Sequence, residues 1–225
     1  MNKYIISIFT FLICLHVFPA FSQQAPQGWL IYFGNTKIKD SKFSIHHELQ
    51  LRDHQIFGDH NQTLVRVGLQ YEILPWLNVT NGYGFIHTEA KGTPNNAFDE
   101  HRIYQEAVAK HALGHFKMRH RVRLEERFIE NQDFRGRARY SLFADLPLTE
   151  KKMSKGGIYG AFYNEIFINL SKDDAIKAFD RNRLYLGAGY KLKDNFGIQA
   201  GYMRQHVGSA KGTNHILLSF HHQIN

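Results

Sequence analysis

The chain has little cysteine and little proline, with one Cys and five Pro in 225 residues. The single cysteine, Cys14, lies in the N-terminal leader described below, so the rest of the chain has no disulfide, thiolate nucleophile or cysteine metal site. Beyond that leader no apolar run approaches the roughly 20 residues of a membrane-spanning helix. What the chain does have is 11 Tyr, 18 Phe and 18 Gly, a composition too aromatic and apolar for a disordered protein.

The first 22 residues have the layout of a secretory signal peptide. Lys3 is followed by an almost wholly apolar stretch, Tyr4 to Phe18, and then by Ala20-Phe21-Ser22, with small residues at the two positions that a signal peptidase reads. The apolar stretch is too short for a membrane anchor helix. We therefore expect residues 1–22 to be a cleaved signal peptide, and the remainder is long enough for one domain.

Apolar and polar residues alternate along most of the remaining chain. Between Phe116 and Phe128 the even-numbered residues are apolar, apart from His120 and Glu126, and the odd-numbered ones are Lys, Arg or Glu. Side chains two residues apart share one face of a β-strand, so this segment separates cleanly as a strand but not as a helix. The same alternation recurs in segments that begin near residues 43, 63, 77, 135, 184, 196 and 215.

The length of these segments favours a membrane barrel over a soluble sandwich. They run for about 10 to 14 residues, whereas sandwich strands usually have about 5 to 6 and a membrane strand needs about 9 to 11. A sheet in lipid cannot leave an edge unpaired and must close into a barrel. Aromatic residues near the segment ends suit interfacial girdles; they are Trp29, Tyr71, Trp76, Tyr190 and Tyr202.

Two further segments, Arg102 to His111 and Ile158 to Leu170, alternate less clearly, and in the second both faces carry aromatic residues. The ten segments together predict an all-β, antiparallel transmembrane β-barrel of about ten strands over residues 43–225. Short turns are expected at the periplasmic rim and long loops at the outer rim, with both chain ends in the periplasm. Residues 23–42 contain one more strand-like stretch, Gln27 to Ile38. Because bacterial single-chain barrels normally have even counts, this stretch is either an extra non-spanning strand or plug, or one member of a twelve-strand barrel.

Short motifs along the chain resemble a family of exported bacterial proteins catalogued as a domain of unknown function, number twenty-four ninety. The motifs are Trp29, Glu48-Leu49-Gln50-Leu51-Arg52, Arg66-Val67-Gly68-Leu69-Gln70-Tyr71, Glu125-Glu126-Arg127, Arg137-Ala138-Arg139-Tyr140, Glu165, Arg183-Leu184-Tyr185-Leu186-Gly187 and Gly201-Tyr202-Met203. The resemblance spans nearly the whole mature chain. It implies an outer-membrane barrel of Gram-negative bacteria and brings no catalytic residue and no known substrate.

The polar faces of two consecutive segments form a ladder of charges. If the turn at 131–133 joins antiparallel strands, Glu125 lies opposite Arg139 and Arg127 opposite Arg137. The lumen charge ladder then consists of Arg119, Arg121, Arg123, Glu125, Arg127, Arg135, Arg137 and Arg139. Candidate lumen partners from other segments are Glu48, Arg52, Arg66, Glu72, Glu165 and Arg183.

Two interpretations of this ladder stay open. In one, Arg–carboxylate pairs fill and rigidify a narrow lumen, because buried charges need partners. In the other, the guanidinium groups form an anion-selective constriction or a site for a phosphate or carboxylate ligand.

The sequence contains no motif for a metal site, an enzyme or a nucleic-acid-binding protein. The 14 histidines contain no His-x-His pair, so we expect no metal site and no cofactor. No Gly-x-Ser-x-Gly motif is present, and the strand spacing of Ser219 and His221 places them about 7 Å apart, so we expect no enzyme. The arginines lack aromatic interleaving and a nucleic-acid-binding motif, so we expect no nucleic-acid partner.

These observations predict an outer-membrane β-barrel, a monomer surrounded by lipid, with a structural role or a role in binding or transporting a small anionic solute. The alternatives are an outer-membrane enzyme that modifies lipid or saccharide, and a soluble periplasmic lipid-binding barrel.

Overall fold

The computed structural model describes residues 25–56, 58–150, 153–170 and 176–225. The predicted signal peptide, residues 1–22, lies outside them. The segments in which apolar and polar residues alternate form eleven strands of 11 to 16 residues. They are β1 (Gln27–Lys37), β2 (Phe43–Asp53), β3 (His60–Leu74), β4 (Leu77–Thr88), β5 (Phe98–Leu113), β6 (Phe116–Ile129), β7 (Arg135–Pro147), β8 (Ile158–Asn169), β9 (Phe179–Lys193), β10 (Phe196–Val207) and β11 (Thr213–Ile224).

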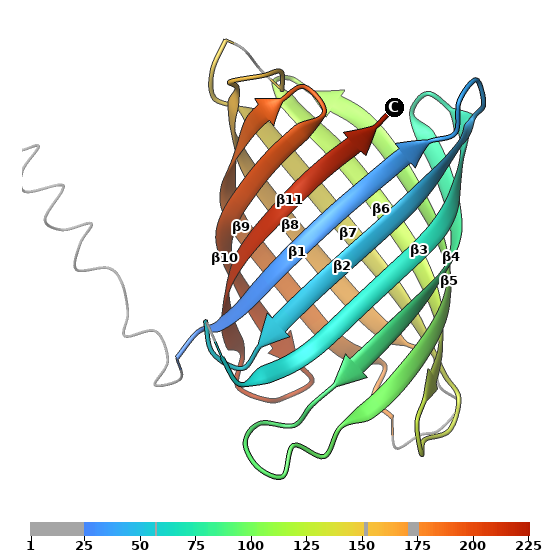
Figure 1. Ribbon diagram of the computed structural model, residues 1–225, viewed down its shortest axis with the longest axis vertical. Helices are drawn as coiled ribbons and strands as arrows, with labels where there is room; N and C mark the ends of the chain where they lie inside the picture. Colours follow the sequence, from blue (N-terminus) through green and yellow to red (C-terminus); the bar gives the residue numbers. More distant parts are fainter. Residues whose placement is uncertain (1–24, 57, 151–152, 171–175) are drawn as a thin grey trace, which may run out of the picture.

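The strands form one closed barrel in chain order, in which each strand pairs antiparallel with the next (Figure 1). The closing pair is different: β1 runs parallel to β11, with Leu30 opposite Leu218. Eleven strands corrects the predicted count of ten, or alternatively twelve. The cause is that the stretch from Gln27 is a full wall strand, and an odd number of alternating strands leaves the first and last pointing the same way.

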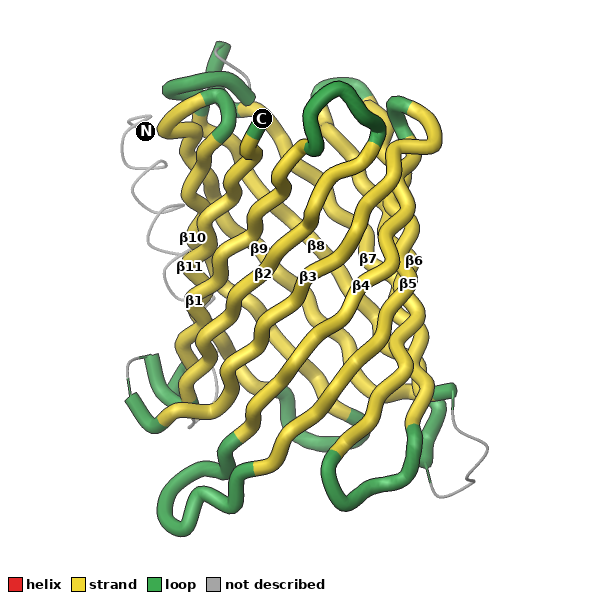
Figure 2. The backbone as a smooth tube through the Cα atoms, turned by 45° about the vertical axis from the view of Figure 1, so that its right-hand side comes forward, coloured by secondary structure: helices red, strands yellow, loops and turns green. Residues whose placement is uncertain are grey.

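The connections divide between two rims (Figures 1 and 2). The short-turn rim carries the links 38–42, 75–76, 114–115, 148–157 and 194–195, and the long-loop rim carries 54–59, 89–97, 130–134, 170–178 and 208–212. With an odd strand count, β1 begins at the long-loop rim and β11 ends at the short-turn rim (Figure 1). The prediction that both ends of the barrel lie at one rim is therefore wrong.

The two faces of the wall have opposite chemistry. The outer face carries apolar rows, and thirty-four large hydrophobic side chains among the described residues are exposed; Leu124 is 46% exposed and Leu186 69%. Their sequence neighbours point inward, where Arg123 is 1% exposed and Glu125 2%. The predicted assignment of apolar rows outward and charges inward is the one that the structure has. No described helix is long and apolar enough to cross a membrane.

The lumen also has an apolar part, on the side of β1 and β8–β11. Its buried members are Trp29, Ile31, Tyr159, Ala161, Tyr185, Met203 and Leu217. Trp29 is thus an interior residue, 7% exposed, which corrects its assignment to an interfacial girdle. The other girdle candidates, such as Trp76 at 51%, are exposed. Trp29 differs because it lies directly opposite the buried Arg52 in the β1–β2 register and so shares its inward face, where Arg52 covers the ring at 3.9 Å.

Inward-facing glycines leave room for tyrosine rings against the wall. A Cβ at Gly82 would lie 2.4 Å from the Tyr104 ring, and one at Gly189 would lie 2.1 Å from the Tyr159 ring. Each ring covers a strand that has no side chain of its own at that point. Large interior aromatics therefore fit without widening the barrel.

Candidate functional site

The arginine ladder lies in the lumen on β6 and β7. The observed register pairs Glu125 with Arg137, Arg127 with Arg135 and Arg123 with Arg139. This corrects the predicted pairing by two residues on one strand. The hairpin is centred on Asn131, whose φ of 57° lies in the left-handed region that Asn tolerates better than most residues. Because the shift is even, every side chain keeps its predicted face.

Two carboxylates hold the middle of the ladder, and both are shared. Glu125 is within 2.6 Å of Arg137 and of Arg139, and 3.8 Å from Arg123. Glu165, on β8, lies 2.6 Å from Arg139 and 2.7 Å from Arg121. Ser141 donates a further hydrogen bond of 2.9 Å to Glu165.

The other candidate lumen partners differ in their contacts, and Arg52, which lines both cavities, is described below. Glu48 forms an ion pair with Arg66 at 2.9 Å, both buried, and accepts a hydrogen bond from Gln50. Arg183 is 3.7 Å from Glu165. Glu72 is exposed near the short-turn rim, and no ion pair joins it to the described part of the chain.

Four carboxylates of the network were missed by the sequence reasoning. Glu100 binds Arg102 and Arg127, Glu106 binds Arg123 at 2.6 Å, Asp145 binds Arg119 at 3.1 Å, and Asp180 binds Arg137 and Arg181. The signal for two of them was present. Arg102 is an inward residue of β5, so Glu100 and Glu106 share its face by parity. The segment from Arg102 to His111 does not separate clearly into two faces, because its outward side is also partly polar.

The lumen contains two cavities of similar size. The short-turn cavity, of about 320 Å³, includes Phe33, Lys110, Arg119 and His221. The long-loop cavity, of about 330 Å³, includes Gln62, Arg127, Arg135 and Arg181. Every arginine of the ladder lines one cavity or the other.

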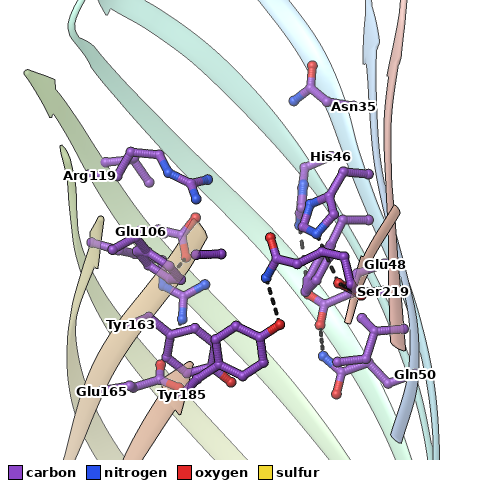
Figure 3. Close-up of a pocket in the computed structure, with 18 of the residues that line it drawn as sticks. Asn35, His46, Glu48, Gln50, Glu106, Arg119, Tyr163, Glu165, Tyr185 and Ser219 are labelled. Atoms are coloured by element: carbon purple, nitrogen blue, oxygen red, sulfur yellow. Dashed lines mark hydrogen bonds and ion pairs between the residues drawn. The ribbon is translucent and has the colours of Figure 1, made fainter. Parts of the chain in front are cut away.

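Five residues line both cavities and mark the boundary between them. We call them the Trp29 cluster; they are Trp29, Arg52, Arg66, Arg139 and Arg183. Figure 3 shows the short-turn cavity, with Glu106 and Arg119 on one side and His46 and Glu48 on the other. The cavity is lined by charged groups on both sides and is not a dry core.

A serine–histidine pair lies in the short-turn cavity. The Oγ of Ser219 is 3.0 Å from Nε2 of His221, so the expectation that they are too far apart for a hydrogen bond is wrong. Side chains two apart on a strand can lean toward each other, and the His221 ring is held by stacking on Phe33 at 5.2 Å. In the described chain, no carboxylate or amide is hydrogen-bonded to the other ring nitrogen of His221.

Several of the remaining histidines lie on the outer wall beside tyrosines. His120 lies 2.8 Å from the Tyr140 hydroxyl and His101 2.5 Å from that of Tyr83. Within the described ranges, no three His, Cys, Asp or Glu side chains are grouped so that they could hold a metal ion.

Comparison with known proteins identifies the family. Residues 26–215 match the family model described as a protein of unknown function, DUF2490, which confirms the resemblance seen in the sequence. The match covers most of the chain, so the chain belongs to this family. No curated protein and no solved structure matches it.

Proposed function

We propose that this member of the DUF2490 family is an outer-membrane β-barrel of a Gram-negative bacterium that binds small anionic solutes in its lumen. The proposal rests mainly on the excess of guanidinium groups over carboxylates among the residues that line the two lumen cavities. The proposal has two parts, a membrane location and an anionic ligand, and each has its own support.

The membrane location is supported by the outer face of the wall. Soluble monomers rarely expose an apolar patch of more than a few hundred Å², whereas here apolar rows such as Val65, Val67 and Leu69 surround the barrel. Strands of 11 to 16 residues are long enough for an apolar band of about 25 Å. A soluble lipid carrier would need the reverse arrangement, with an apolar lumen. Closure of the sheet leaves no edge to pair with a second copy, which supports a monomer.

The anionic ligand is supported by how the carboxylates are used. Glu125 is shared by three arginines and Glu165 contacts three, Arg121, Arg139 and Arg183. One carboxylate can neutralise only one guanidinium, so the surplus positive charge attracts small anions into the lumen.

Cell fractionation tests the membrane location. The protein is expected in the outer-membrane fraction and to require detergent for extraction. Release by osmotic shock without detergent would contradict the location and favour the soluble periplasmic alternative.

Planar-bilayer recording tests the charge of the lumen. In a KCl gradient, any current through the refolded barrel is expected to reverse at a potential that indicates anion preference. A cation-preferring current would contradict the proposal. An absence of current would indicate that the lumen is closed at the Trp29 cluster. The barrel would then bind anions without conducting them.

A second candidate function rests on the Ser219–His221 hydrogen bond. A serine with a histidine on its hydroxyl is the minimal arrangement for acyl transfer. The cavity around it includes the apolar residues Phe33, Ala161 and Leu217, which suit an acyl chain. This candidate is an outer-membrane enzyme that acts on lipid, and a serine-reactive probe separates it from the anion-binding barrel.

A further inference from the structure

The long-loop cavity has the largest charge imbalance in the lumen. Among the described residues that line it are nine arginines but only two carboxylates, Glu100 and Asp180. Both carboxylates are already shared: Glu100 is 2.6 Å from Arg102 and from Arg127, and Asp180 is 3.0 Å from Arg137. Carboxylates outside this lining, Glu48, Glu125 and Glu165, pair with Arg66, Arg137, Arg139 and Arg183. Two lining arginines, Arg52 and Arg135, form no ion pair with any described residue.

Arg52 is the clearest such group. It lies at the floor of this cavity, is 9% exposed and has no ion pair with any described residue. Its guanidinium donates to the amide oxygens of Gln50 and Gln62, the latter at 2.6 Å, and covers the Trp29 ring. These contacts satisfy hydrogen bonds but do not neutralise the charge, and a buried unpaired charge is costly.

Arg183 and His215 contact the same indole ring as Arg52 does. The guanidinium of Arg183 is 4.9 Å from the Trp29 ring centre, and its nearest carboxylate, Glu165, is 3.7 Å away. His215 packs edge-on against Trp29 and is 1% exposed, and its Nδ1 has no hydrogen-bond partner in the described chain. An anion bound here would accept hydrogen bonds from Arg52, Arg183 and His215 together.

The short-turn cavity is better balanced. Its cations, which include Lys110 and Arg119, face four carboxylates: Glu48, Glu106, Asp145 and Glu165. Arg119 already has its own ion pair with Asp145. A multivalent anion is therefore attracted more strongly to the long-loop cavity.

We infer that Arg52, Arg183 and His215, arranged around Trp29 at the floor of the long-loop cavity, form a binding site for a multivalent oxyanion such as phosphate or a phosphomonoester. Guanidinium forks match the oxygens of such anions, and more than one fork can bind one anion. The cavity volume of about 330 Å³ is in the range of small-molecule sites, so an organic phosphate fits as well as the free ion. The site opens toward the long-loop rim, and this inference rests on the proposed function.

Calorimetry on the barrel refolded in detergent tests the site. The probes are inorganic phosphate and glycerol 3-phosphate, titrated at fixed ionic strength against chloride, with glycerol as the uncharged control. Phosphate is expected to bind and glycerol is not. Tighter binding of glycerol 3-phosphate identifies an organic phosphate as the ligand, and tighter binding of the free ion identifies phosphate itself.

Variants locate the site. Arg52→Gln and Arg183→Gln are each expected to weaken phosphate binding about tenfold or more, the effect of losing a hydrogen bond to a charged group. Arg52→Lys keeps the charge without the fork and is expected to lie between Arg52→Gln and the parent. The control Arg204→Gln, whose side chain is bonded to Asn214 on the outer side of β10, is expected to stay within about twofold. Arg119→Gln, in the short-turn cavity, is expected to weaken phosphate binding less than either Arg52→Gln or Arg183→Gln does.

The outcomes separate the two proposals. Unchanged binding in both Arg52→Gln and Arg183→Gln, or a loss confined to Arg119→Gln, would overturn this site while leaving an anion-binding lumen. Absence of any phosphate or glycerol 3-phosphate binding by the parent protein would overturn the site and the anionic ligand together. The melting temperature of each variant, measured without phosphate, confirms that loss of binding is not loss of folding.

Discussion

The carboxylate of Glu125 on β6 accepts two hydrogen bonds, of 2.6 and 2.9 Å, from the guanidinium of Arg137, its cross-strand partner on β7. Both side chains are buried, at 2% and 3% exposure. The same carboxylate also binds Arg139, so Glu125 and Glu165 are the two carboxylates that hold the mid-lumen arginines.

Glu125→Gln is expected to destabilise the barrel by about 3–5 kcal/mol, because it removes one of the two carboxylates that each of the buried guanidinium groups of Arg137 and Arg139 contacts. Urea unfolding of the refolded protein measures the change. The adjacent Glu126→Gln is the matched control: Glu126 points to the opposite face and no ion pair joins it to the described residues, so a change within about 0.5 kcal/mol is expected. Equal effects of the two substitutions would show that the lumen pair contributes nothing specific.

Gly82→Ala is expected to destabilise the barrel by about 1–3 kcal/mol, because its methyl group would overlap the Tyr104 ring. Gly160→Ala, also in a strand, is the control, since nothing lies within 4 Å of its added Cβ. That substitution is expected to be neutral or slightly stabilising. Thermal unfolding in one detergent compares them, and a Gly82→Ala protein as stable as Gly160→Ala would contradict the packing of Tyr104 on the wall.

The two tryptophans lie at different places on the barrel. In vesicles that contain brominated lipid, Trp76 is expected to be quenched because it is 51% exposed in the turn at the short-turn rim, whereas Trp29 is inside the lumen. Trp76→Phe should therefore remove most of the lipid-dependent quenching and Trp29→Phe should not. Similar quenching of both residues, or of neither, would contradict the proposed lipid-facing wall.

A disulfide can test how the barrel closes. Leu30 lies opposite Leu218 across the parallel pair, and adjacent strands are about 4.8 Å apart, a separation that a disulfide spans. Leu30→Cys combined with Leu218→Cys should cross-link on oxidation. Leu30→Cys with Ile216→Cys, offset by two residues and thus about 8 Å apart, should not. Failure of the first pair would favour a ten-strand barrel with β1 outside the wall.

Ser219→Ala tests the enzyme candidate. If the hydroxyl activated by His221 is a nucleophile, a fluorophosphonate probe labels the parent barrel and Ser219→Ala abolishes the labelling. Ser141→Ala is the control, since Ser141 also points into the lumen but is bonded to Glu165 rather than to a histidine. No labelling of the parent protein would contradict an activated serine and leave the binding function alone.

Much of this protein is determined by the sequence itself. The alternation around Arg123 and Leu124 predicts which side chains face the lumen, because the two-residue period of a strand is a local property of the backbone. The same local signal predicts strands over most of residues 43–225 and a charged interior. In β8 the alternation is ambiguous because both faces carry aromatic residues, so the inward face of Glu165 is settled by the structure and not by the local pattern.

Tertiary structure decided what depends on contacts between distant segments. The parallel pairing of β1 with β11 joins residues nearly 190 positions apart, and no local pattern reports it. Closure in turn places Trp29 inside, between Arg52 and Arg183, whereas its position near a strand end had suggested an interfacial role. The choice of carboxylate for each arginine likewise depends on register and on side-chain conformation across the lumen. Alternation is a property of one strand, but ion pairing and closure belong to the assembled wall.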